Sequence, residues 1–188
     1  MKGVTYTLRN AIYVALTNAS NAKTLMQTRG PAFAMPPHSG FAALDAEPDA
    51  QQLLQAVKEA LAKRDKPPDE LVFAGQGEPL MRMRVLQEAA ASLRDAQMLR
   101  MRVSTNGLVP SSNGASVARA LESSGVSAVS VALATADAEQ YIELMQPEQL
   151  RLTPVHSLEL GLPDVTDFVR ACVAAGLEVE CNVVEAPG

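Results

Sequence analysis

Three glutamates are the residues of this chain whose type and position could support acid–base chemistry. Glu78 lies in a glycine-rich turn, AGQGEP, which follows a short apolar segment. Glu178 and Glu180 alternate with apolar residues near the end of the chain, so they would share one face of a strand. Acid–base catalysis needs a complete set of partner groups, and the sequence offers none. Pairing of the two C-terminal glutamates with Arg100 and Arg102 is therefore the interpretation that we favour.

The cysteines and histidines do not form a recognisable ligand set. Cys172 and Cys181 each fall on the apolar side of a periodic segment, which predicts inert buried thiols. His38 and His156 lie far apart in loops and lack the spacing of a zinc site. We therefore predict neither a zinc site nor a redox pair.

Composition favours a single cytoplasmic domain. A length of 188 residues with 47% hydrophobic residues is enough for one core, so one domain over residues 1–188 is expected. A net charge of -5 and an aromatic content of 4% argue against a nucleic-acid surface. No apolar run approaches the roughly 18 residues of a membrane span. Two cysteines and an N-terminus without a secretory pattern favour the cytoplasm.

Hydrophobic periodicity predicts a β-hairpin followed by alternating strands and helices. Asp49 with Gln52 forms a capping-box pattern, Asp137 is a second candidate cap, and Asn113-Gly114 is expected to precede a helix. Residues 31–48 are expected to form a surface loop. The expected strands are 4–8, 11–16, 70–74, 98–105, 129–133 and 177–184, and the expected helices contain 53–61, 85–93, 117–121, 141–144 and 165–173.

Polar and apolar residues alternate along the segments 98–105 and 177–184. Parallel strands covered by helices on both faces would instead be continuously apolar. Alternation indicates a curved sheet whose hollow side holds water or a polar ligand. We therefore predict an α/β fold, an incomplete (β/α) TIM-like barrel with an N-terminal β-hairpin.

Residues 16–30, LTNASNAKTLMQTRG, follow the second expected strand, where barrel enzymes carry their first active-site loop. Further motifs follow in order: AGQGEPLMR at 74–82, VSTNGL at 103–108, VSVAL at 129–133 and YIELMQP at 141–147. Over nearly its whole length the chain resembles the TatD-associated radical SAM proteins. In that family the first loop holds a four-iron, four-sulfur cluster through three cysteines spaced C-x3-C-x2-C. Here those positions are Ser20, Thr24 and Gln27.

The resemblance implies a site for S-adenosylmethionine at the ends of the strands. Gly77 and Glu78 would approach the amino group of this ligand, Ser104 and Asn106 would lie near its ribose, and Ser130 would belong to the next strand of the site. Hydroxyl and amide groups do not replace cluster-binding thiolates, so we expect no iron–sulfur cluster. The family name also suggests a TatD-type nuclease as partner.

We predict a radical SAM pseudoenzyme, a non-catalytic binding or regulatory protein that retains weak binding of an adenosyl ligand. Two alternatives stay open. One is an active radical SAM enzyme whose cluster is held by a partner's cysteines or by an unusual ligand set. The other is a conventional barrel enzyme that uses Glu78, Glu178 or Glu180 as acid or base.

Overall fold

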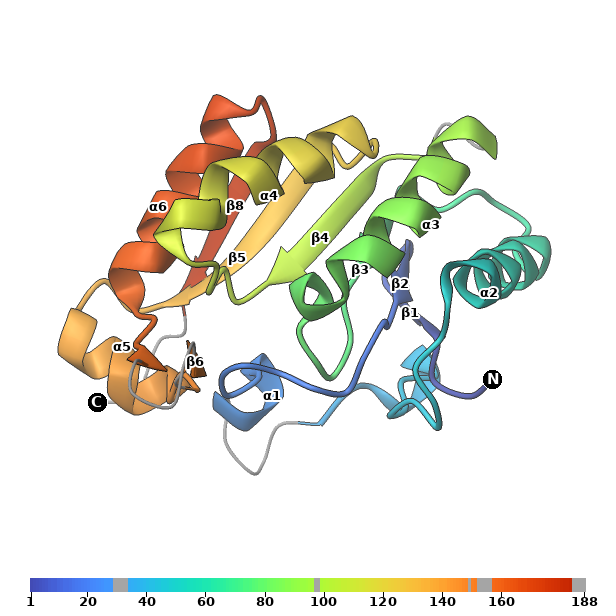
Figure 1. Cartoon of the computed structure of the whole chain (residues 1–188). Coiled ribbons are helices and arrows are strands. Elements are labelled where there is room, and N and C mark those ends of the chain that lie inside the picture. The colour runs from blue at the N-terminus through green and yellow to red at the C-terminus, as the bar shows by residue number, and fades with distance from the viewer. Residues whose placement is uncertain (29–33, 97–98, 149, 152–156, 184–188) are drawn as a thin grey trace.

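The computed structural model of the chain describes residues 1–28, 34–96, 99–148, 150–151 and 157–183. Its main feature is a six-stranded sheet in the order β1-β2-β3-β4-β5-β8 (Figure 1). β1 and β2 form an antiparallel hairpin, and the other neighbouring strands are parallel. The strands are β1 (Thr5–Leu8), β2 (Ala11–Val14), β3 (Glu70–Phe73), β4 (Met101–Thr105), β5 (Ala128–Ala134) and β8 (Glu178–Val183).

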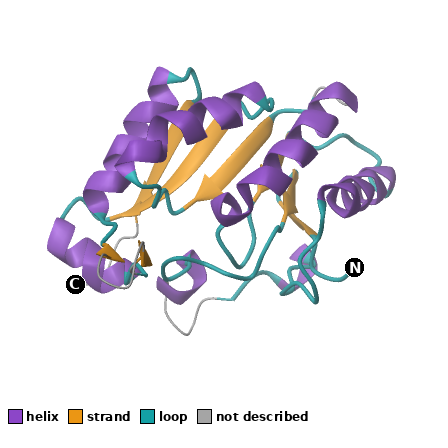
Figure 2. Cartoon of the chain, in the orientation of Figure 1, coloured by secondary structure: helices purple, strands orange, loops and turns teal. Residues whose placement is uncertain are grey.

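Helices alternate with the parallel strands (Figure 2). Figure 1 shows α3, α4 and α6 along one face of the sheet and α2 beside the hairpin, whereas α1 and α5 lie near the carboxyl ends of the strands. The helices are α1 (Leu25–Thr28), α2 (Ala50–Ala62), α3 (Met83–Ala96), α4 (Ser111–Ser123), α5 (Ala138–Met145) and α6 (Leu162–Ala174), with 3-10 turns η1 (Pro37–Ser39) and η2 (Pro79–Arg82) and a separate strand pair β6 (Leu150–Arg151) and β7 (Ser157–Leu158).

The predicted α/β class and the N-terminal hairpin are confirmed. The sheet is open, with β1 and β8 at its two edges, so the barrel geometry stays a prediction. Within the described ranges, no helix is long and apolar enough to cross a membrane.

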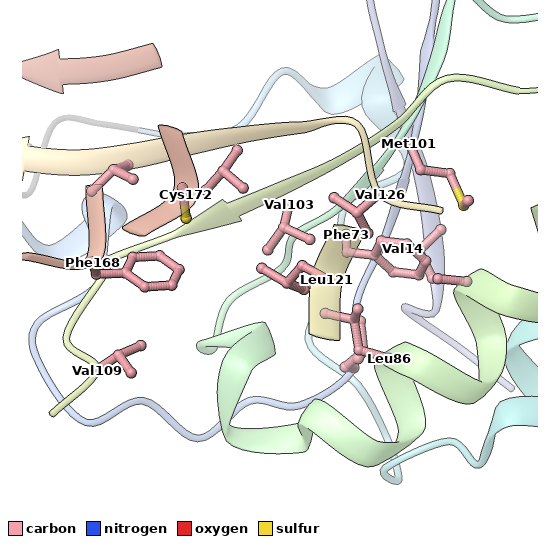
Figure 3. Packing of buried hydrophobic residues seen from close by; sticks show 14 of the residues in the cluster. Val14, Phe73, Leu86, Met101, Val103, Val109, Leu121, Val126, Phe168 and Cys172 are labelled. Carbon is pink, nitrogen blue, oxygen red and sulfur yellow. The ribbon is translucent and has the colours of Figure 1, made fainter. Parts of the chain in front are cut away.

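The sheet has one continuous apolar face, whereas its other face is polar on β4 and β8 and carries a small apolar cluster of Ala11, Tyr13, Val72 and Ala74 at β2 and β3. The register places one row of apolar side chains across the sheet: Val14, Phe73, Val103, Val129 and Val179. The first four of these are fully buried. Figure 3 shows Leu86 of α3, Leu121 of α4 and Phe168 of α6 packed on this side of the sheet. Because side chains alternate along a strand, the polar residues between these positions face the other side.

Carboxylate caps begin two of the helices as the sequence predicts. Asp49 accepts a hydrogen bond from the backbone of Gln52, whose side chain accepts one from the backbone of Asp49, which completes the capping box of α2. Asp137 caps α5 by accepting the N–H of Gln140 at 2.8 Å. Such caps satisfy backbone donors that have no partner within the helix.

One further carboxylate serves two helices. Oδ1 of Asp164 accepts the backbone N–H and the hydroxyl of Ser111, the first residue of α4, at 3.0 and 2.9 Å. Oδ2 of Asp164 accepts the N–H of Gly161, which precedes α6, at 3.0 Å. Asp164 therefore joins the starts of α4 and α6, which flank the end of the sheet that carries the candidate site.

Two sequence predictions are wrong. Asn113-Gly114 lies inside α4, where Gly114 faces α6; a Cβ atom there would lie 3.7 Å from Cα of Phe168. The close approach of the two helices overrides the turn preference of this dipeptide.

Cys181 is exposed because β8 is an edge strand of the described sheet. Cys172 is buried as predicted, and burial raises the pKa of its thiol to about 12.

Candidate functional site

The turn after β3 packs directly against the loop after β2. The backbone N–H of Gly77 donates to the carbonyl of Thr17 at 3.1 Å, and that of Glu78 donates to the carbonyl of Ala19 at 2.8 Å. A Cβ atom at Gly77 would lie only 2.3 Å from the carbonyl oxygen of Ala19. Because no side chain fits in that space, glycine is required here to let the two loops meet.

Glu78 is buried, with 5% of its surface exposed, and its carboxylate accepts three hydrogen bonds. Oε1 accepts the N–H of Leu80 at 3.0 Å and the hydroxyl of Thr105 at 2.7 Å, and Oε2 accepts the N–H of Asn106 at 2.8 Å. Burial raises the pKa of this carboxyl, although the hydrogen bonds oppose the shift. It forms no ion pair with any described residue.

An open pocket of about 70 Å³ lies at this junction, beyond the carboxyl ends of β3 and β4. Four predicted site residues line it: Gly77, Glu78, Ser104 and Asn106. The hydroxyl of Ser104 has no hydrogen-bond partner in the described part of the chain, so it is available to a ligand. The side chain of Asn106 is already engaged, since it donates to Oδ1 of Asn21 at 2.8 Å and accepts the N–H of Leu108 at 2.9 Å.

The three positions expected for cluster ligands bond to their own loop instead. The Thr24 N–H donates to Oε1 of Gln27 at 2.8 Å and the Gln27 N–H donates to Oγ1 of Thr24 at 3.4 Å, which forms a capping box at the start of α1. The Ser20 hydroxyl donates to the carbonyl of Ala22 at 2.7 Å. Neutral hydroxyls and an amide do not fit a four-iron, four-sulfur cluster, which requires thiolates.

Other metal ligands are also scarce around this loop. The described residues contain no group of three or more histidine, cysteine, aspartate or glutamate side chains that could hold a metal ion. His156 lies outside the described residues, and His38 is exposed in η1.

Lys23 and Gln76 line the same pocket, and the sequence interpretation did not include them. The backbone N–H of Lys23 donates to the carbonyl of Met145 at 2.7 Å, which fixes this part of the loop against the end of α5. Its ammonium group makes no ion pair within the described ranges. A charged residue in the middle of the expected cluster loop was the signal that could have identified it.

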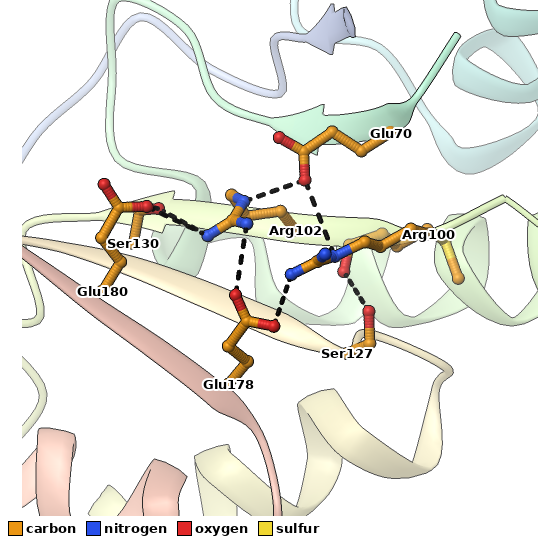
Figure 4. Close-up of polar contacts among 8 residues, drawn as sticks. Glu70, Arg100, Arg102, Ser127, Ser130, Glu178 and Glu180 are labelled. Carbon is orange, nitrogen blue, oxygen red and sulfur yellow. Dashed lines mark hydrogen bonds and ion pairs between the residues drawn. The ribbon is translucent and has the colours of Figure 1, made fainter.

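Ser130 lies in a charged network on the polar face of the sheet and does not line the pocket (Figure 4). Its hydroxyl accepts from Nη1 of Arg102 at 3.0 Å and donates to Oε2 of Glu180 at 3.4 Å. Arg102 also donates from Nε to Glu70 at 3.0 Å, and Nη2 of Arg100 donates to Glu178 at 2.6 Å. The predicted pairing of Glu178 and Glu180 with the two arginines is confirmed.

The loop before α2 is anchored on the Leu-Thr-Asn motif. Asn18 donates to the carbonyl of Leu44 at 2.9 Å and accepts the N–H of Leu44 at 3.0 Å. Thr17 and Arg82 both donate to the carboxylate of Glu47 at 2.5 Å. Thr17 and Asn18 thus hold this loop beside the pocket. Residues 29–33, at the start of the connection, lie outside the described residues.

Comparisons with known proteins support the fold. No protein-family model matches the chain, and no curated protein matches it. Among solved structures, it is similar to a radical SAM methyltransferase from Sphaerobacter thermophilus, with a TM-score of 0.51 and 13% sequence identity. The match covers 96% of this chain and 69% of the other. At this identity the likeness shows the fold alone, so the chain has a radical SAM-like α/β fold.

Proposed function

We propose that this chain is a degenerate radical SAM-like protein of the TatD-associated type, which binds an adenosyl or amino-acid-like ligand without performing radical chemistry. The observation that carries the proposal is the pocket just described, at the carboxyl ends of β3 and β4 and beside the start of α1. It combines the ligand-binding positions Glu78 and Ser104 with Ser20 and Thr24, which stand where cluster cysteines are expected. Four of the five predicted binding residues line the pocket, and the three predicted cluster positions carry no thiolate.

The residues around the pocket fit an adenosyl ligand better than they fit a cluster. Glu78 is a buried carboxylate held by hydrogen bonds but lacking a positive partner among the described residues, so a ligand ammonium would supply the missing charge. Ser104 lines the pocket at the same edge of the sheet, and its hydroxyl has no hydrogen-bond partner among the described residues. When bound with a cluster, S-adenosylmethionine is a source of radicals; without the cluster, the pocket supplies only binding and orientation.

A role in regulation or binding agrees with this assignment. The association with a TatD-type nuclease and the cytoplasmic location are part of the proposal; the first rests on the family resemblance, and the second on the two cysteines and an N-terminus without a secretory pattern. The sheet-face glutamates are weaker candidates for a conventional acid or base because Glu178 and Glu180 are paired with arginines.

Anaerobic reconstitution with iron and sulfide tests the loss of the cluster. We expect the reconstituted wild-type chain to retain no stoichiometric iron. A triple variant with Ser20→Cys, Thr24→Cys and Gln27→Cys is the control for cluster assembly in this loop. About four irons per wild-type chain, with thiolate-type absorbance, would contradict the proposal and favour an unusual ligand set.

Calorimetric titration with S-adenosylmethionine and S-adenosylhomocysteine tests the binding site. Glu78→Gln preserves the shape of the side chain but removes its charge, so it should weaken binding about 10- to 150-fold, as expected for a charge-assisted hydrogen bond. Glu143→Gln, on the exposed side of α5, is the matched control and should bind like the wild type. Absence of binding to both ligands at millimolar concentration would refute the proposed site.

A further inference from the structure

β1 is an outer strand of the described sheet, and β2 is its only neighbour there. The two strands pair in antiparallel register, with Thr5 opposite Val14. The backbone N–H of Ala15 donates to the carbonyl of Val4 at 2.8 Å, so these residues form a hydrogen-bonded pair. Because such pairs alternate with non-bonded pairs along an antiparallel ladder, Thr5 and Thr7 direct their backbone N–H and carbonyl groups away from β2.

The surrounding hydrogen bonds agree with this direction. The carbonyl of Val14 accepts the N–H of Ala74 at 2.9 Å, so it points toward β3 and not toward Thr5. Among the residues that the structure describes, none outside the hairpin hydrogen-bonds to the backbone of Thr5 or Thr7. The outer side of β1 therefore presents free main-chain donors and acceptors two residues apart.

The two outer strands of the described sheet differ in their protection against a further strand. Charged side chains and proline commonly protect such edges. β8 carries Glu178 and Glu180, whose side chains are 63% and 58% exposed. β1 has the sequence TYTL, which contains neither a charge nor a proline. Of these two edges, β1 is the one that is open to strand addition.

A groove of about 750 Å³ lies between this edge and α2. Figure 1 shows α2 beside the hairpin. Thr5 and Thr7 contribute to the strand side of the groove, and the half-buried Ala56 and Ala60 contribute to the helix side. These small side chains leave room for another segment. The groove shares no lining residue with the pocket at the carboxyl ends of β3 and β4.

The end of the groove near the turn between β1 and β2 carries more positive than negative charge. Lys63 and Arg64, at the end of α2, line the groove together with one anion, Glu59. Arg64 reaches the turn by donating to Oδ1 of Asn10. Glu59 already accepts a hydrogen bond from Gln55 at 2.8 Å. Lys63 forms no ion pair within the described ranges, so its ammonium is available to an acidic group.

We propose that this edge and groove bind an extended segment of a partner protein, which adds to β1 as a further strand and places an acidic side chain beside Lys63. The main chain of the segment pairs with Thr5 and Thr7, and its alternate side chains face α2. An extended polypeptide fits because its donors and acceptors recur every second residue, as they do along β1. This surface is separate from the ligand pocket, so the inference does not depend on the proposed function.

Peptide selection tests the proposal. A displayed library of random decapeptides is selected on the wild-type chain, and the enriched peptides are synthesised and titrated by fluorescence anisotropy. We expect these peptides to share an acidic residue at a fixed position. N-methylation at alternate peptide positions should weaken binding about 10-fold, as for loss of one main-chain hydrogen bond, whereas methylation at the intervening positions should have little effect.

Variants of the chain test the two sides of the groove. Lys63→Glu should weaken the enriched peptides by about 5-fold or more, because an exposed attraction becomes a repulsion. Lys58→Glu is the matched control, since Lys58 is an exposed residue of α2 that does not line the groove, and it should bind like the wild type. Thr7→Pro removes an N–H that β2 does not use and should also weaken binding.

Thermal unfolding shows whether each variant is folded, and the N-methylated peptides test the same main-chain bonds on the wild-type chain if Thr7→Pro is not. Enrichment of no peptide above an unrelated protein would refute the proposal. Binding that tolerates N-methylation at every position, or that is equal for wild type and Lys63→Glu, would also refute it. A dimer in sedimentation that Thr7→Pro abolishes would assign the edge to a second copy of the chain and overturn the partner segment.

Discussion

The buried carboxylate of Glu78 accepts the backbone N–H of Asn106 at 2.8 Å, which joins the turn after β3 to the end of β4. The neighbouring hydroxyl of Thr105 donates to the other oxygen of the same carboxylate at 2.7 Å. Glu78 is therefore a structural tie between two loops as well as a candidate ligand for an amine, and these two roles can be separated by experiment.

Replacement of Glu78 by Ala should destabilise the fold. The change leaves Thr105 and the backbone N–H of Asn106 without their buried acceptor, which should lower the free energy of unfolding by roughly 1–3 kcal/mol. Urea unfolding measures the loss, with Glu143→Ala as an exposed control. Equal stability of Glu78→Ala and wild type would mean that the turn and the strand end are not joined in this way.

The stability contributed by Glu78 should depend on pH. Its pKa in the folded state is raised above the ordinary value of 4.5, so the folded state binds the proton more tightly than the unfolded state. The free energy of unfolding should therefore fall as the pH rises from about 4.5 to the raised pKa, and this component should be constant above it. The measurement is the difference between wild type and Glu78→Gln across this range; parallel curves would contradict the prediction.

Gly77→Ala should disrupt the junction of the two site loops. The added methyl group would lie 2.3 Å from the carbonyl oxygen of Ala19, so the backbone must shift. We expect the free energy of unfolding, measured by heat or urea, to fall by about 1–3 kcal/mol, together with weaker ligand binding. Gly114→Ala is the matched control, because its methyl would make an ordinary contact with Cα of Phe168 in α6 at 3.7 Å and should stabilise α4 by about 0.5–1 kcal/mol.

Asp164→Ala should weaken the starts of α4 and α6 together. It removes the hydrogen-bond acceptor for Ser111 and for the N–H of Gly161. We expect the free energy of unfolding to fall by at least the amount usual for loss of one helix cap, about 1–2 kcal/mol. Asp167→Ala, which removes only an exposed pair with Arg170, should cost about 0.5 kcal/mol or less. Unfolding curves that are the same for both variants would contradict the shared cap.

The sequence by itself determined the properties that depend on short-range pattern. Alternation along residues 101–105 predicted one buried and one polar strand face, and Asp49 and Asp137 marked two helix starts, because these signals act within a few residues. The pairing of Glu178 and Glu180 with Arg100 and Arg102 also follows from which face each side chain occupies. The identities of Ser20, Thr24 and Gln27 define the donor chemistry of the first loop regardless of its conformation.

Only the tertiary structure decided how these segments meet. The burial of Glu78 depends on Thr105 and Asn106, which are 27 and 28 residues away, and the space at Gly77 depends on the loop at Ala19. Lys23 enters the pocket because its backbone is bound to the end of α5. Cys181 is exposed because its strand lies at the edge of the described sheet. Burial and charge pairing are set by neighbours in space, which local periodicity does not identify.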